Sequence, residues 1–286
     1  MCENDSGSGQ IMKLAIIGCG YVGSAVARMW HQSGHEVIVT TTTPDKKQQL
    51  REIATEVAVV TGSDLTGLQR VVSDRDVVLL SVGSKQRTPQ GYRLAYLETA
   101  RNVVKAIRTT PGVKQLIYTG SYGILKENSG ATIDETVEVK PKDEYGQILY
   151  QTEQELLSVQ SESIVCILRL TGIYGAGREL IKIFRRVSGT TRPGRGEEYT
   201  NWVHREDIVR ALDFARIKQL QGIYHLNSDE ILTIKEFLDR LFEAHNLPSV
   251  TWDSSQPSTR TSNIKLDNQK LKNAGFELVH PQIEFE

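Results

Sequence analysis

The sequence has few cysteines, no long apolar run and almost no net charge. Only 3 of its 286 residues are cysteines, and Cys2, Cys19 and Cys166 are too scattered for a disulfide framework or a cysteine-rich metal site. No apolar run approaches the length of a membrane span. Basic and acidic residues nearly cancel, 34 against 35, without a block of either sign. We therefore expect a small-molecule partner, neither nucleic acid nor a membrane, and a reducing cytoplasm as the location.

The first ten residues, Met1 to Gln10, are polar and rich in glycine and serine. They lack the basic and then apolar pattern of a secretory signal. We expect residues 1–10 to form a disordered leader that takes no part in the fold.

The most informative segment is KLAIIGCGYVGSAVA, from Lys13 to Ala27. A short apolar stretch leads into Gly-x-Gly-x-x-Gly and then into a helical pattern. In this arrangement Gly18 permits a tight turn, Gly20 lets a pyrophosphate approach the backbone, and Gly23 lets the helix pack closely on the strand. The helix N-terminus then faces the phosphates. The segment predicts a dinucleotide site, and an ordinary glycine-rich turn is the alternative.

Six apolar runs recur along the chain, separated by helical or loop sequence. They are continuous rather than alternating, as strands are when helices bury both faces of a sheet. The pattern predicts an α/β fold of the Rossmann type, with a doubly wound parallel sheet. The six runs are Leu14 to Ile17, Val37 to Val39, Val57 to Val60, Val77 to Leu80, Leu116 to Tyr118 and Ile164 to Leu168.

The pattern loosens beyond about residue 170. We expect a Rossmann domain over residues 11–225, with residues 173–200 contributing to a small C-terminal α/β cap that residues 226–286 complete. Within the cap, Thr233 to His245 has helical spacing of its apolar residues, and Thr190 to Glu198, with Pro193 and nearby glycines, predicts an exposed loop.

Four further segments resemble the NAD-dependent epimerase/dehydratase family, among the extended and atypical short-chain dehydrogenases/reductases. They follow the glycine turn in the order that this family has, and the resemblance covers nearly the whole chain. The segments are Gly62-Ser-Asp64-Leu65, the stretch from Arg169 to Arg178 that contains Tyr174-Gly175-Ala-Gly177, the stretch from Trp202 to Ile208 that contains His204 and Asp207, and the stretch from Gly222 to Asn227.

The resemblance implies a nicotinamide dinucleotide cofactor, with Asp64 at the adenine. An acid that would select NAD is absent from the end of the second strand, near Thr41, where the sequence is Thr40-Thr-Thr-Thr43-Pro44-Asp45-Lys46-Lys47. This favours NADP modestly over NAD. The alternative is a helix-opening turn with Asp45 as its cap and solvated lysines. The candidate cofactor-binding residues are Gly18, Gly20, Tyr21, Val22, Gly23, Thr41, Thr42, Asp64, Leu65, Ser81 and Val82.

The resemblance also implies the catalytic residues. A serine or threonine after the fifth strand polarises the reacting oxygen, and Ser121 matches it best, with Thr119 in reserve. A helical tyrosine moves the proton, and Tyr145 matches it. The lysine that follows four residues later in the family is Leu149 here.

The missing lysine matters because residues four apart lie on one helix face. A tyrosine without a neighbouring cation has a pKa of about 10, so roughly one part in a thousand is ionised at neutral pH. Abstraction of a proton by Tyr145 would be poor, whereas donation is less affected. Reduction is therefore favoured over oxidation.

Other polar residues have two interpretations. Tyr122 and Lys126 have the family's tyrosine–lysine spacing, but they follow a strand and lead into loop sequence, so we interpret the match as coincidence, with Lys126 as a candidate displaced cation. His204 and Asp207 are interpreted as structural, and no spacing indicates a metal site. Arg178, Arg192 and Arg195 either bind a phosphorylated substrate or are solvated loop charges.

Taken together, the residues and the resemblance predict an NAD(P)-dependent, atypical epimerase/dehydratase-like oxidoreductase. Its expected substrate is a small carbonyl or a sugar-nucleotide-like molecule. The alternative is a dinucleotide-binding sensor or interaction protein that has little or no catalytic activity, as Leu149 would suggest.

Overall fold

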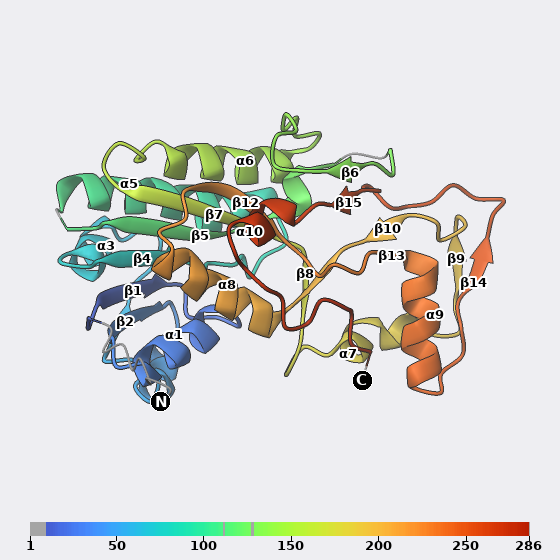
Figure 1. The fold of residues 1–286 in the computed structure, drawn as a ribbon, viewed down its shortest axis with the longest axis horizontal. Coiled ribbons are helices and arrows are strands. Elements are labelled where there is room, and N and C mark those ends of the chain that lie inside the picture. Colours follow the sequence, from blue (N-terminus) through green and yellow to red (C-terminus); the bar gives the residue numbers. More distant parts are fainter. Residues whose placement is uncertain (1–9, 111, 127–128, 286) are drawn as a thin grey trace, which may run out of the picture.

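The computed structural model describes residues 10–110, 112–126 and 129–285, so the predicted leader lies outside the described residues except for Gln10. At the centre of the described residues lies a seven-stranded sheet, in which every pair of neighbouring strands is parallel. The strand order is β12-β7-β5-β4-β1-β2-β3 (Figure 1). The strands are β1 (Lys13–Ile17), β2 (Glu36–Thr41), β3 (Glu56–Val59), β4 (Val77–Leu80), β5 (Gln115–Ser121), β7 (Ile164–Leu170) and β12 (Gly222–Leu226).

Helices cover both faces of this sheet (Figure 1). Successive residues of β1 point to opposite faces: Leu14 and Ile16 join one core cluster, and Ala15 and Ile17 join the other. The first cluster includes α1 (Gly23–Gln32) and α8 (Arg205–Ile217), and the second includes α3 (Leu65–Val72), α5 (Thr99–Thr109) and α6 (Glu144–Leu157). The predicted doubly wound parallel sheet is confirmed, with the six predicted strands in place.

The seventh strand, β12, was not among the predicted strands. It pairs with β7 at one end of the sheet. The strands were predicted from continuous apolar runs, and β12 has no such run because it contains Tyr224 and His225. Tertiary packing, with His225 fully buried, decides its conformation.

A third apolar cluster lies around Trp202 and Phe237 and includes residues from Tyr174 to Ile283. The predicted helix over 233–245 is confirmed as α9 (Ile234–Ala244), which a capping box between Thr233 and Glu236 opens. The strands pair as β8 (Gly172–Tyr174) with β11 (Trp202–His204), β9 (Thr191–Pro193) with β14 (Thr251–Asp253), and β10 (Tyr199–Thr200) with β13 (Leu232–Thr233).

The expectation of an exposed loop over Thr190 to Glu198 is wrong in part. Its first residues form β9, which pairs in parallel with β14, and Gly194 and Gly196 are buried. A Cβ at Gly196 would lie 2.6 Å from the Trp252 ring, so the glycine there permits close packing as well as a turn.

The remaining elements are short. The chain returns to the main sheet through β15 (Lys265–Leu266), which pairs with β6 (Thr132–Ile133), and α10 (Gln269–Asn273), which packs beside β12. The others are α2 (Lys47–Leu50), α4 (Pro89–Tyr92), α7 (Leu180–Phe184), the 3-10 turns at Pro44–Lys46, Tyr122–Ile124 and Arg185–Val187, and a π-helical turn at Arg93–Glu98. Among the helices described, none has the length and apolar character to cross a bilayer.

Candidate functional site

The three glycines of the turn after β1 meet three different surroundings. Gly18 has a φ of +96°, and a Cβ there would lie 2.4 Å from the Ser81 carbonyl oxygen. A Cβ at Gly23 would lie 2.3 Å from the Gly18 carbonyl oxygen, so this glycine lets α1 pack against the turn. A Cβ at Gly20 would meet nothing within 4 Å. Protein atoms thus leave no room for a side chain at Gly18 and Gly23, whereas the space beside Gly20 is empty. A ligand that approaches the backbone of the turn needs such a space.

The turn is fastened to the end of β2. The Gly18 N–H donates to Thr40 Oγ1 at 2.9 Å, and the Cys19 N–H donates to the Thr40 carbonyl at 3.0 Å. No side chain of the described residues caps α1, whose first turn follows Val22. Its first N–H groups and the positive end of its dipole therefore suit a bound anion.

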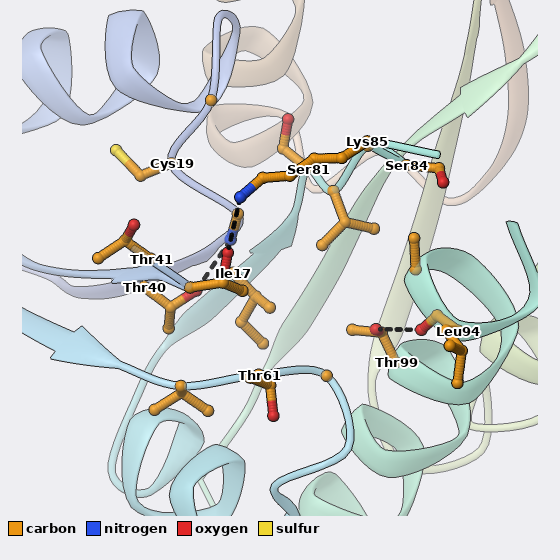
Figure 2. Close-up of a pocket in the computed structure, with 18 of the residues that line it drawn as sticks. Ile17, Cys19, Thr40, Thr41, Thr61, Ser81, Ser84, Lys85, Leu94 and Thr99 are labelled. Atoms are coloured by element: carbon orange, nitrogen blue, oxygen red, sulfur yellow. Dashed lines mark hydrogen bonds between the residues drawn. The ribbon is translucent and has the colours of Figure 1, made fainter. Parts of the chain in front are cut away.

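A cavity of about 500 Å³ opens at the carboxyl ends of the central strands (Figure 2). Parallel α/β sheets bind their ligands at this edge. Of the predicted cofactor-binding residues, the lining includes Gly18, Gly20, Thr41, Thr42, Ser81 and Val82, whereas Tyr21, Val22, Gly23, Asp64 and Leu65 lie outside it. The rest of the lining comprises Ile17, Cys19, Thr40, Thr43, Lys46, Val60, Thr61, Gly62, Ser63, Leu68, Gly83, Ser84, Lys85, Gln86, Gly91, Leu94, Ala95, Glu98 and Thr99.

Asp64 has a structural task in this structure. Its carboxylate accepts the Gly67 N–H at 2.9 Å and caps α3, and Leu65 packs against the core. The cavity is lined instead by the three residues before Asp64, which are Thr61, Gly62 and Ser63. The predicted contact of Asp64 with an adenine therefore stays a prediction.

Lys85 was missed by the sequence analysis. Its Nζ reaches from the loop after β4 across the cavity mouth to within 3.4 Å of Thr42 Oγ1 and of Thr43 Oγ1 (Figure 2). Lys46 lines the same end of the cavity. Two ammonium groups and several hydroxyls therefore gather at the end of β2, although Lys85 lies 42 residues or more from those threonines in the chain.

The π-helical turn Arg93–Glu98 forms another wall of the cavity. Thr99 Oγ1 donates to the Leu94 carbonyl at 3.2 Å, and a Cβ at Gly62 would lie 1.8 Å from that hydroxyl (Figure 2). Turns of this kind recur at functional sites because they displace side chains from the regular helix register. The wall also holds the Glu98 carboxylate, which pairs with Arg101 at 2.8 Å.

Ser121 and Thr119 lie at the carboxyl end of β5, two residues apart and hence on one face of the strand. Ser121 Oγ accepts the Gly123 N–H at 3.1 Å. Thr119 Oγ1 lies 3.3 Å from Ser81 Oγ and 3.4 Å from the Leu80 carbonyl. Thr119 is thus tied to the neighbouring strand β4, and Ser121 lies nearer to the strand end.

Tyr145 lies in the first turn of α6. Asp143 caps that helix by accepting the Gly146 N–H at 2.8 Å, and it also pairs with Lys126. The Tyr145 hydroxyl donates to the Arg87 carbonyl at 3.1 Å, and its ring meets the Tyr92 ring edge to face, with centroids 4.9 Å apart. Lys126 therefore neutralises the cap of the helix that carries Tyr145, while Tyr122 packs against an apolar cluster.

Leu149 is only 8% exposed and belongs to that cluster, together with Ile124, Leu125, Ile133, Ile264 and Leu266. One further turn along the same face, Glu153 forms a buried ion pair with Arg169 of β7, with 2.8 Å between Nη2 and Oε2. Burial raises the pKa of Glu153, and Arg169 opposes that shift. At the position where the family resemblance implies a lysine, Leu149 therefore makes apolar contacts. The ion pair between Glu153 and Arg169 then joins the helix to β7.

The later predicted residues are dispersed. His204 caps α8, and the Asp207 carboxylate accepts the Val279 and His280 N–H groups at 2.7 and 3.0 Å, so both have structural contacts, as we expected. Arg178 is exposed on the loop after β8. Arg192 lines a separate cavity of about 70 Å³ in the cap, with Arg260, and Arg195 is exposed. Arg178 and Arg192 thus do not line one cavity in the described chain.

Comparison with known proteins decides the family. The sequence profile described as "NAD dependent epimerase/dehydratase family" matches residues 14–225. The chain belongs to this family. The family's cofactor dependence agrees with the glycine turn and the cavity, and the match extends to the end of the main sheet, one residue short of the end of β12.

Several known sequences and solved structures resemble this member of the family. Protein YeeZ of Escherichia coli (strain K12) is 28% identical over 208 residues, covering 70% of this chain and 71% of that protein. The structure of MoeE5 in complex with UDP-glucose and NAD has a TM-score of 0.77 at 18% identity, covering 92% of each chain. The UDP-glucose 4-epimerase of Thermotoga maritima, solved with UDP-glucose, has a TM-score of 0.76 at 19% identity, covering 93% of each chain. At these identities the solved structures show the shared fold.

Proposed function

We propose that the protein is an NAD(P)-dependent oxidoreductase of the epimerase/dehydratase type, acting on a small carbonyl or a sugar-nucleotide-like substrate. The observation that carries the proposal is the open position at Gly20, on the rim of a cavity of about 500 Å³, between two glycines that could not carry a Cβ. This arrangement fits a dinucleotide, because its pyrophosphate must approach the backbone more closely than any side chain permits. Two of the similar structures hold UDP-glucose, a sugar nucleotide.

The residues that would hold the cofactor are those of the turn and of the β2 end. Gly20 and the first turn of α1 would face the pyrophosphate, and Thr61 to Ser63 would face the adenine. When bound, the nicotinamide supplies or takes up a hydride. Lys46 and Lys85 support NADP over NAD, because a 2′-phosphate next to Thr42 and Thr43 would accept charge-assisted hydrogen bonds from them.

The chain supplies the proton and the polarising contact. Ser121 Oγ, at the end of β5, would donate a hydrogen bond to the substrate oxygen, and the Tyr145 hydroxyl would give that oxygen its proton. In the structure the Tyr145 hydroxyl donates to the Arg87 carbonyl instead, so it has to exchange that acceptor for the substrate. Leu149 offers no ammonium for returning a proton, which favours the reductive direction.

We place the reaction in the cytoplasm. The free thiols of Cys19 and Cys166 suit a reducing compartment. Burial raises the pKa of Cys19 to about 11 and that of Cys166 to about 12, so both stay protonated at neutral pH and are packing residues rather than nucleophiles.

A dinucleotide-binding sensor is the second candidate, and one observation favours it. Leu149 is not a lone substitution on an open surface but part of a packed apolar cluster that includes residues of β6 and β15. A protein that had kept the cavity and given up proton transfer would have this combination of features.

A turnover assay separates the two candidates. Purified protein is incubated with NADPH or NADH and a panel of aldehydes and ketones, and separately with NADP⁺ or NAD⁺ and a panel of UDP-sugars. The loss or gain of reduced cofactor is followed. We expect turnover that falls roughly 10²- to 10⁴-fold in Tyr145→Phe with unchanged cofactor affinity, while Tyr150→Phe, on the same helix, keeps the wild-type rate. Tight cofactor binding without turnover on the panel would favour the sensor. Equal rates in wild type and Tyr145→Phe would remove Tyr145 as the proton donor.

A further inference from the structure

Two histidines and a glutamate from distant parts of the chain converge at the N-terminal end of α8. His204 and Glu206 lie at the start of that helix, and His280 comes from the C-terminal segment, which passes beside it (Figure 1). Within the described residues, each of the three offers a ligand atom within 4.8 Å of the other two. His280 Nε2 lies 3.1 Å from Glu206 Oε2, and the two imidazole rings have centroids 3.7 Å apart.

We propose that His204, Glu206 and His280 bind a divalent transition-metal ion of the zinc type. Imidazole nitrogens and a carboxylate oxygen are the ligands that such ions prefer. With bonds of about 2.0–2.1 Å, the ligand atoms of a tetrahedral zinc lie about 3.3 Å apart. The 3.1 Å between His280 Nε2 and Glu206 Oε2 is close to that separation. A ring nitrogen of His204 lies within 4.8 Å of a ligand atom of each of the other two residues, so a small side-chain movement would bring it to bonding distance of the same ion.

The surroundings of His280 support this role. Its Nδ1 lies 2.6 Å from Glu284 Oε1 and its Nε2 lies 3.1 Å from Glu206 Oε2, so a metal ion would displace the proton that Nε2 shares with Glu206 while Nδ1 keeps donating to Glu284. Pairing of a ligating histidine with a second carboxylate is the usual way in which proteins orient such a ligand. The backbone of this segment is already fixed, because the Val279 and His280 N–H groups both donate to the Asp207 carboxylate.

The other two ligands are held at the start of α8, where His204 is the N-cap residue and Glu206 lies in the first turn. His204 Nδ1 accepts the Glu206 N–H at 3.3 Å, at the long end of hydrogen bonds.

A bound ion would link the C-terminal segment to the loop after β8, which contacts Tyr21 of the glycine turn. A Cβ at Gly175 would lie 2.7 Å from His204 Nε2, so the loop after β8 is in close contact with this ring. The next residue of that loop, Ala176, accepts a hydrogen bond from the Tyr21 hydroxyl at 3.0 Å. We therefore assign the site a stabilising role, one that goes beyond the proposed oxidoreductase function and does not depend on it.

Metal titration of the full chain tests this proposal. The protein is stripped with a chelator, in a Cys2→Ser background that removes the thiol outside the described residues, and is titrated with Zn²⁺ by calorimetry and with Co²⁺ by visible absorption. We expect one saturable equivalent, ligand-field bands between about 500 and 700 nm for Co²⁺ in a site of low coordination number, and a higher melting temperature with Zn²⁺.

Glu206→Gln and His280→Ala should each weaken binding by about 10- to 100-fold or more. Glu277→Gln, an exposed carboxylate of the same C-terminal segment, should bind as the parent does. Glu206→Gln preserves the side-chain volume and keeps the test valid if His280→Ala fails to fold. Absence of a saturable equivalent, or equal affinity in the parent and Glu206→Gln, would overturn the proposal. Neither result bears on dinucleotide binding, which the chelated protein should retain.

Discussion

The hydroxyl of Tyr145 donates a hydrogen bond to the backbone carbonyl of Arg87, 3.1 Å away. Arg87 belongs to the loop after β4, and two residues earlier in that loop Lys85 reaches Thr42 and Thr43 at the end of β2. One loop therefore contacts both the candidate proton donor and the candidate 2′-phosphate site. We expect cofactor binding at Lys85 to alter the position of the Arg87 carbonyl and so the freedom of the Tyr145 hydroxyl.

The first prediction concerns the choice between NADP and NAD. Lys85→Ala removes an ammonium from the end of β2 and should weaken NADPH binding by roughly 10-fold or more, because a hydrogen bond between charged groups contributes about 1.5–3 kcal/mol. NADH, which lacks the 2′-phosphate, should bind as to the wild type. Calorimetric titration of both cofactors measures the two affinities.

Lys47→Ala is the matched control for this change. Lys47 is exposed and adjacent to Lys46, but only Lys46 lines the cavity. An equal loss of NADPH affinity in Lys47→Ala would indicate a general charge effect. A loss of NADH affinity as large as that of NADPH in Lys85→Ala would contradict a 2′-phosphate contact.

The second prediction concerns Leu149. Leu149→Lys would introduce, one helical turn from Tyr145, the lysine that the family resemblance implies at this position, but it would place that cation in an apolar cluster where the leucine is 8% exposed. We expect it to lower the free energy of unfolding by roughly 2–4 kcal/mol, through lost packing and the burial of a charge. Chemical denaturation measures this change.

Leu149→Met keeps the volume and apolar character of the site, so it should cost less than about 1.5 kcal/mol. A Leu149→Lys protein as stable as the wild type would show that the ammonium reaches solvent or the cavity. In that case the cluster has room for the lysine, and a gain in turnover would mark the site as a weakened catalytic centre.

The third prediction concerns pH and the cap of α6. The hydrogen bond from Lys126 lowers the pKa of Asp143, with a smaller contribution from the Gly146 N–H. A carboxyl whose folded pKa lies below its unfolded value of about 3.9 stabilises the fold above that value, and this contribution is lost as the pH falls through the folded pKa. The stabilisation is thus present at pH 7 and disappears in acid.

Asp143→Asn retains a side-chain oxygen for the cap but loses the charge. We expect it to be less stable than the wild type by up to about 1 kcal/mol at pH 7, with the gap closing as the pH falls below the unfolded value of about 3.9. Asp45→Asn, an exposed aspartate in the turn after β2, is the control. A gap that keeps its size as the pH falls until the fold is lost would show that the charge of Asp143 does not stabilise the helix.

Local sequence patterns were enough for the main sheet and the glycine turn. Continuous apolar runs are formed by residues close together in the chain, and the roles assigned to Gly18, Gly20 and Gly23 agree with the spaces around them. The strand β12 escaped this reasoning because tertiary contacts bury its polar residues. Asp64 was interpreted through the family resemblance alone, although Asp64 and Gly67 also have the spacing of a helix cap, which is the role the structure shows.

Contacts between distant residues could not be predicted in this way. Lys85 meets Thr42 only because the loop after β4 folds across the cavity mouth, and the π-helical turn has no distinctive sequence pattern. His204 and His280 are 76 residues apart in the sequence, so their contact depends on how the C-terminal segment packs against α8. The placement of Ser121 and Tyr145 as a catalytic pair stays a prediction, because the Ser121 hydroxyl contacts the Gly123 N–H and the Tyr145 hydroxyl contacts the Arg87 carbonyl.

The most direct test of the account is cofactor binding to the wild type and to Gly20→Val. Because a Cβ at Gly20 meets nothing within 4 Å, this variant should fold and melt as the wild type does. Its side chain would occupy the space that the pyrophosphate needs, so calorimetry should show micromolar binding of NADPH or NADH to the wild type and at least about a tenfold loss in the variant. Binding of equal strength in both proteins, or no binding of either dinucleotide to the wild type, would contradict the account.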